Sequence, residues 1–130
     1  MHLKKRAGRL YLAATVMRVC RTLKMIKVKI RENSWLAKIA ARQLKSYSVA
    51  MVIGKTIYLH NATKADFLKD KRWVRHEVAH VKQYKQLGII RFLAFYLLES
   101  FNKGYENNRF EVDARQKERD FSILSDILFS

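Results

Sequence analysis

Two histidines and a glutamate near the middle of the chain are spaced to bind a metal ion. His76 and His80 stand four positions apart, and Glu77 follows the first of them, giving the pattern H-E-x-x-H. On a helix, residues four apart lie on one face, so both imidazoles can reach the same ion. Two imidazoles, one carboxylate and an open position for water are typical of catalytic zinc. The spacing therefore predicts zinc (Zn²⁺) as the cofactor, bound by His76 and His80, with Glu77 as the general base.

The third protein ligand is expected to be a carboxylate downstream of the motif. Glu111 is favoured because it lies in the first turn of an expected helix, whose rigid backbone suits a ligand. Glu106, which precedes two asparagines in an expected loop, is the main alternative. The full set of downstream candidates is Glu99, Glu106, Glu111, Asp113 and Glu118.

The elements before and around the motif can be predicted from hydrophobic periodicity. Residues 49–59 are rich in β-branched and apolar side chains, with Gly54 as the first residue of a tight hairpin turn or as a bulge in one strand. Thr63 is expected to cap a helical segment that runs to Leu87, with a break near Asp70 and a stop at Gly88. The motif thus falls within a helix.

Three further helices are expected. The first begins after Asn33 or Ser34, and its apolar stripe of residues 35–44 is expected to face the core. Residues 89–101 are almost all apolar, which predicts a buried helix or, alternatively, a hydrophobic surface beside the site. A last helix is expected from Arg109 or Phe110 to Leu128. Together these patterns predict an α+β fold, mostly helical, with a short β-hairpin or small sheet before the motif helix.

Positive charge is concentrated at the N-terminus. The chain has a formal net charge of +16, and residues 1–31 contain ten basic residues and no acidic one. We therefore divide it into a basic amphipathic arm, 1–31, and a domain, 32–130, with a strand-like pattern over residues 25–30. The arm is expected either to attach to an anionic membrane surface or to pack on the domain with its basic side in water. Nucleic acid is a less favoured partner, because no nucleic-acid-binding motif accompanies the charge.

Length and cysteine content set further bounds. A chain of 130 residues is long enough for one domain with a modest core, and its single cysteine cannot form an intramolecular disulfide. The short apolar stretch in the arm is far below the ~18–20 residues of a membrane span. We expect a cytoplasmic protein, with attachment to the cytoplasmic face of a membrane as the alternative.

The motif and its setting resemble the gluzincin zinc metallopeptidases, and more closely the small single-domain zincin-like proteins, many described as domains of unknown function. The resemblance covers roughly residues 49–120 and is carried by Gly54–Leu59, Trp73–Gly88 and Gly104–Arg115. It implies that His76, His80 and Glu111 bind zinc and that Glu77 is the base. Larger gluzincins place an aspartate four residues after the glutamate ligand, where this chain has Arg115. Asp113, Glu118 or a backbone carbonyl could replace that aspartate.

The resulting prediction is a zinc-dependent metallopeptidase acting on a peptide or protein. The strand region 49–59 would align the substrate, and Tyr105 or Arg109 would be a second donor to the oxyanion. One alternative is a zinc-binding adaptor or structural domain without catalysis. Another is a peripheral membrane or nucleic-acid-binding protein in which the His-Glu motif has no role.

Overall fold

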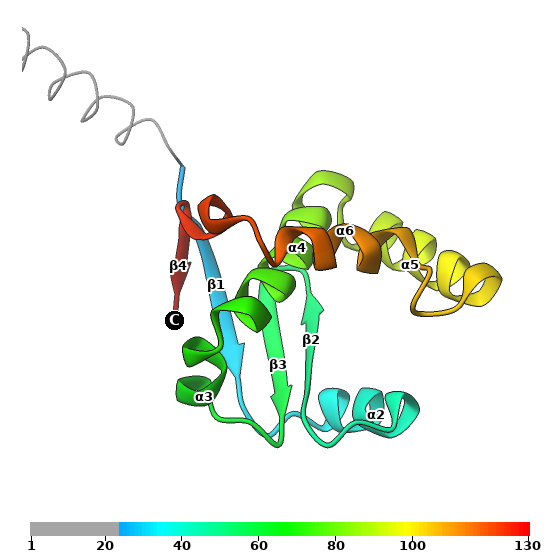
Figure 1. Ribbon diagram of the computed structural model, residues 1–130, viewed down its shortest axis with the longest axis horizontal. Helices are drawn as coiled ribbons and strands as arrows, with labels where there is room; N and C mark the ends of the chain where they lie inside the picture. Colours follow the sequence, from blue (N-terminus) through cyan, green and yellow to red (C-terminus); the bar gives the residue numbers. More distant parts are fainter. Residues whose placement is uncertain (1–23) are drawn as a thin grey trace, which may run out of the picture.

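The structure is a computed structural model that describes residues 24–130. A small sheet is packed against a set of helices in a mixed α+β arrangement, as predicted (Figure 1). In chain order the elements are β1 (Ile26–Arg31), α2 (Trp35–Leu44), β2 (Val49–Ile53), β3 (Thr56–His60), α3 (Lys64–Lys69), α4 (Lys71–Leu87), α5 (Ile89–Lys103), α6 (Arg109–Lys117), the 3₁₀ helix η1 (Phe121–Leu124) and β4 (Ile127–Phe129).

The sheet has the strand order β2-β3-β1-β4. β2 and β3 are antiparallel and form the hairpin predicted for residues 49–59, with Ile53 opposite Thr56. Gly54 begins the turn with φ +62°, a left-handed conformation that glycine adopts without steric cost. β1 runs parallel to both β3 and β4, so β2 is an edge strand of the described sheet.

β1 joins the basic arm to the sheet. Its apolar residues Ile26 and Val28 are buried while Lys27 and Lys29 are exposed, so the alternation predicted a strand correctly. β1 lies within residues 1–31, which were assigned to the arm from their charge alone. In the structure it is paired on both sides within the sheet, so the last residues of the arm are part of the fold. The amphipathic helix expected earlier in the arm lies outside the described residues.

The C-terminal segment differs from the single helix that was expected to reach Leu128. α6 ends at Lys117, and Asp120 then caps the short helix η1 by accepting a hydrogen bond from the Ser122 amide. Ile127–Phe129 becomes β4, which pairs with the free side of β1. The segment forms a strand because the unpaired edge of β1 offers backbone hydrogen bonds that a longer helix would leave unused.

α4 crosses the sheet and fills the centre of the molecule (Figure 1). Asp70 ends α3 and caps α4 by accepting a hydrogen bond from the Trp73 amide, which accounts for the predicted break. Gly88, with φ +81°, ends α4 as predicted. The apolar face of α4 packs on the inward side chains of the sheet; the shared core includes Val28, Ile57, Leu59, Val74, Val78 and Val81.

The apolar residues of two helices, α2 and α5, are more exposed than predicted. On α2 the buried residues are Ala37 and Ala41, whereas Trp35 and Ile39 are at least half exposed. The expectation that the α2 stripe faces the core was therefore wrong, because small alanines allow the closest approach to the hairpin. On α5 only Phe92 is buried, so the alternative of a hydrophobic surface holds instead of a buried helix. Among residues 24–130, no helix is both long and apolar enough to cross a membrane.

Candidate metal centre

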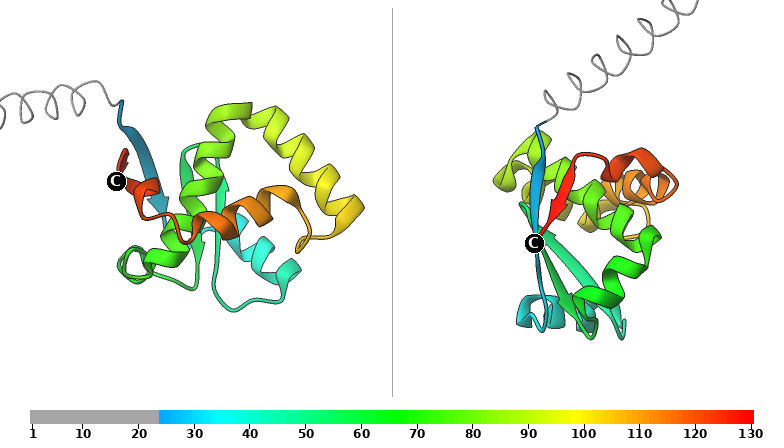
Figure 2. Two further views of the ribbon diagram at one scale, coloured as in Figure 1. Left: turned by 45° about the horizontal axis from the view of Figure 1, so that its top comes forward. Right: turned by 90° about the vertical axis from the view of Figure 1, so that its left-hand side faces the viewer.

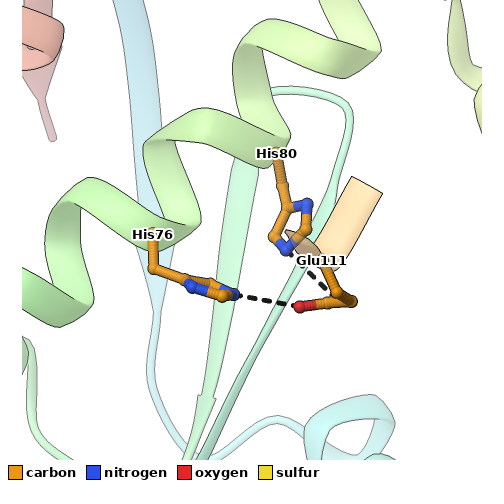
Figure 3. A group of neighbouring side chains, drawn as sticks. All are labelled: His76, His80 and Glu111. Carbon is orange, nitrogen blue, oxygen red and sulfur yellow. Dashed lines mark hydrogen bonds and ion pairs between the residues drawn. The ribbon is translucent and has the colours of Figure 1, made fainter. Parts of the chain in front are cut away.

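Three side chains from two helices meet beside α4. His76 and His80 project from successive turns of α4, and Glu111 reaches them from the first turn of α6 (Figure 3). One ligand atom from each residue lies within 4.8 Å of the other two. His76 Nε2 is 3.1 Å from Glu111 Oε2, and His80 Nε2 is 3.3 Å from Glu111 Oε1. The helical spacing and the favoured carboxylate thus come together as the sequence suggested.

The other nitrogen of each histidine is held by a hydrogen-bond acceptor. His76 Nδ1 lies 2.9 Å from Glu118 Oε1, and His80 Nδ1 lies 2.8 Å from Gln83 Oε1. Since carboxylate and amide oxygens only accept, both Nδ1 atoms carry the proton and donate. Both Nε2 atoms therefore face the Glu111 carboxylate, and each offers a lone pair on that side once it has lost its proton. This tautomer is the one that histidine uses to bind a metal through Nε2.

The charges of these groups reflect this arrangement. Burial alone would lower the pKa of His76, but its hydrogen bond to Glu111 and the nearby charge of Glu77 raise that pKa to about 9. The pKa of His80 is raised against burial by the same two carboxylates. Burial opposes the charge on Glu111, yet hydrogen bonds from both histidines hold its pKa well below the usual range. The Glu111 carboxylate thus favours positive charge on the two histidines that face it.

The two acceptors of the histidine hydrogen bonds, Glu118 and Gln83, are themselves held by further contacts. Glu118 accepts from His76 and also forms an ion pair with Arg72. The Gln83 amide nitrogen donates to Asp113 Oδ2 at 2.8 Å and to the Phe110 carbonyl at 3.0 Å, which turns its oxygen toward His80.

These contacts supply the histidine partners that were expected from an aspartate at position 115. Arg115 lies where an aspartate was expected, and it instead pairs with Glu106 at the surface. Glu118, two helical turns after Glu111, contacts His76 directly. Asp113 contributes through Gln83 without touching a histidine. Both acids named as replacements therefore have a part, and Gln83 was not foreseen.

Glu111 is itself supported by tyrosines. The Tyr96 hydroxyl donates to Glu111 Oε1 at 2.6 Å. Tyr105 is close enough that burial, followed by the charge of Glu111, raises the pKa of its hydroxyl. Tyr105 stays 37% exposed, so it stands between the carboxylate and solvent. The structure thus places the predicted donor Tyr105 beside the cluster, whereas the guanidinium of the alternative, Arg109, lies over the rings of Phe95 and Phe110.

Glu77 lies at the same site but outside the ligand set. Its side chain is buried, and its Oε1 accepts a hydrogen bond of 3.1 Å from the indole of Trp73. Burial is the largest influence and raises the pKa of Glu77, although the charges of His80 and His76 oppose the increase. A carboxylate with a raised pKa is suited to accept and return a proton near neutral pH.

Sequence reasoning missed three residues of this site. Gln83 is three positions after His80 and Trp73 is four before Glu77, so helical spacing could have indicated both. Tyr96 gave no such signal, because its position depends on how α5 crosses α4. The remaining candidate carboxylates are paired elsewhere, Glu99 with Lys103 and Glu106 with Arg115.

The donor set fits a zinc ion. Two imidazole nitrogens and a carboxylate are common zinc ligands, and ligand atoms at 2.0–2.1 Å in a tetrahedron lie about 3.3 Å apart. Each histidine nitrogen lies at about that distance from one Glu111 oxygen, His76 Nε2 at 3.1 Å from Oε2 and His80 Nε2 at 3.3 Å from Oε1. Both histidines also have the outer hydrogen bond that usually orients a metal ligand.

Comparison with known proteins finds a family model that matches the part of the chain from β1 to α4. The eCIS core domain model matches residues 23–88, which run from just before β1 to the end of α4. The match includes His76, Glu77 and His80, while Glu111 lies beyond it. No curated protein and no solved structure gives a significant match. Because the family model covers half of the 130 residues, the chain belongs to the eCIS core domain family.

Proposed function

We propose that this protein is a zinc-dependent metallopeptidase, with zinc held by His76, His80 and Glu111. The observation that supports this most is the convergence of three side chains that can bind a metal. Hydrogen bonds at both Nδ1 atoms leave the two Nε2 atoms facing one carboxylate, and one ligand atom from each residue lies within 4.8 Å of the other two. A metal ion can take the place of the protons that the metal-free histidines share with Glu111, and the donor types favour zinc. When bound, zinc lowers the pKa of a water molecule to near 7 and polarises a carbonyl group.

Glu77 is the proposed general base. It follows His76 on α4, and its buried carboxylate has a raised pKa. In this role it takes a proton from the attacking water and delivers it to the nitrogen of the broken peptide bond. The Trp73 indole holds one carboxylate oxygen, so the other is available for proton transfer. Tyr105, beside Glu111 and partly exposed, is the proposed donor to the oxyanion of the peptide carbonyl.

β2 is the proposed edge for an extended substrate. It ends the described sheet, and its outer side has no strand partner within residues 24–130. A peptide can add to such an edge through backbone hydrogen bonds, which favours proteins and peptides over smaller substrates.

The substitution Glu77→Gln separates zinc binding from catalysis. Glutamine keeps the size of the side chain and the oxygen facing Trp73 but cannot take up a proton at neutral pH. We expect Glu77→Gln to retain zinc and to lose at least about 100-fold in peptide cleavage, the usual contribution of a general base. Cleavage would be followed by mass spectrometry on an unbiased peptide library.

Two results would count against this proposal. If wild type and Glu77→Gln cut the library equally, the cleavage does not use this site. If the zinc-loaded wild type cuts no peptide, the site is a structural or adaptor zinc site, which is the first alternative given in the sequence analysis. Tyr105→Phe, which removes only the hydroxyl, is expected to lower kcat while zinc content stays unchanged.

A further inference from the structure

α5 presents an apolar row to solvent along its whole length. Ile90 is 84% exposed, Leu97 65% and Phe101 90%. These residues are separated by seven and four positions, so they lie on one side of the helix and span about 16 Å. Leu93 and Leu98 flank the row and are also exposed. Exposed apolar rows of this size mark a surface that is covered by something else.

The opposite side of α5 is the one that packs on the domain. Phe92 is buried against Tyr84 and Phe110, and Tyr96 reaches Glu111. Figures 1 and 2 show α5 leading away from the end of α4 at the side of the molecule. The helix is therefore anchored on one side and accessible on the other, so a flat partner can approach the exposed row along its full length.

The basic residues near the start of α5 favour an anionic partner. Lys85 and Arg91 are exposed near the start of α5, and within residues 24–130 neither forms an ion pair. Glu99, on the same helix, and Glu106, just after it, are paired with Lys103 and Arg115. Residues 32–130 carry a net charge of +6, which is the +16 of the chain less the ten basic residues of 1–31, so a second copy of the domain would bring like charge to this surface. An anionic surface is complementary to it.

We propose that the exposed face of α5, defined by Ile90, Leu93, Leu97, Leu98 and Phe101, docks onto an anionic lipid bilayer. The helix lies in the plane of the interface, with these side chains among the acyl chains and the nearby cations at the headgroups. α5 has 15 residues and is too short to span the bilayer, so it binds the surface only. This attachment is separate from that expected for the basic arm and does not depend on zinc or catalysis.

Two phenylalanines provide a matched test in the full-length protein. Phe101 on α5 is 90% exposed and Phe121 on η1 is 82% exposed, and Figure 1 shows η1 on the opposite side of the molecule from α5. Phe101→Glu and Phe121→Glu change the net charge equally, so attraction through the arm is altered equally. Binding is measured by cosedimentation with phosphatidylglycerol vesicles and with phosphatidylcholine vesicles, and folding is checked by circular dichroism.

We expect Phe101→Glu to weaken binding to phosphatidylglycerol vesicles about tenfold or more relative to Phe121→Glu, and Leu97→Glu with Phe101→Glu to weaken it further. Wild type should bind phosphatidylcholine vesicles at least about tenfold more weakly. Equal binding by the two single variants would overturn the proposal and leave the arm as the membrane contact. A wild-type dimer that Phe101→Glu makes monomeric, with vesicle binding unchanged, would also overturn it in favour of a second copy.

Discussion

α4 and α5 are consecutive helices whose composition and burial are opposite. α4 carries the charged and polar residues of the site, yet eight of its seventeen residues are buried, including Glu77, His80 and Gln83. α5 has ten apolar residues among its fifteen, yet only Phe92 is buried. The burial of these two helices depends on the elements around them and not on their composition. α4 lies between the sheet and two helices, whereas α5 packs on the domain along one side only. Buried polar groups on α4 and exposed apolar groups on α5 both point to partners that the fold alone does not supply.

The strongest test of this comparison uses two phenylalanines on the same helix. Phe92→Ala should lower the free energy of unfolding by about 3–5 kcal/mol, since Phe92 is 3% exposed and contacts Tyr84, Tyr96 and Phe110. Phe101→Ala should change it by no more than about 0.5 kcal/mol. Urea denaturation of both variants measures the difference. Similar losses would mean that α5 packs on the domain through its outer face.

The next largest effect is the pH dependence of the free energy of unfolding in metal-free protein, which arises from the histidines of α4. The pKa of His76 is raised to about 9, so its protonated form stabilises the fold at pH values below about 6.5. This contribution is lost as pH rises from 6.5 to 9, and His80, whose pKa is also raised, acts in the same direction. We expect the free energy of unfolding to fall by roughly 3 kcal/mol over this range for His76. Denaturation of chelator-treated protein at pH 6 and pH 9.5 tests this, and His76→Ala should show a smaller decrease.

A smaller effect is expected at the residues that orient the zinc ligands. Glu118→Gln removes the charge that accepts the Nδ1 hydrogen of His76 and should weaken zinc affinity about 10–100-fold. Glu106→Gln removes a carboxylate that pairs with Arg115 at the surface, and zinc affinity should change less than about twofold. Competition with a chromogenic chelator gives both values. Equal affinities for the two variants would show that Glu118 has no role in holding His76.

Local sequence signals indicated which side chains meet at the candidate site better than they indicated which residues lie at the surface. Helical spacing predicted that His76 and His80 share one face, and Glu111 was favoured as the third ligand because it lies in the first turn of an expected helix. The structure brings the three side chains together. The pairing of the histidines depends on periodicity within one helix, and the choice of Glu111 on a local helix start. The start and stop signals at Asp70 and Gly88 are local in the same sense.

Other features could not be predicted because they depend on distant parts of the chain. β4 forms because β1, about one hundred residues earlier, offers a free edge; the sequence of Ile127–Phe129 alone fits a helix equally well. Tyr96 joins the site only because α5 crosses α4 at that residue. The apolar composition of α5 suggested burial, but no other element of the described fold is available to cover its outer side.

The central claim is that buried polar residues of α4, together with Glu111, form a zinc site. The most direct measurement is zinc content after dialysis, by mass spectrometry, for wild type, His80→Ala and His60→Ala. His60 ends β3 and does not belong to the cluster, so it controls for loss of any histidine. We expect about one zinc per chain in wild type and His60→Ala and a loss in His80→Ala greater than any positioning variant causes. Wild type without zinc, or His80→Ala with full zinc, would contradict the account.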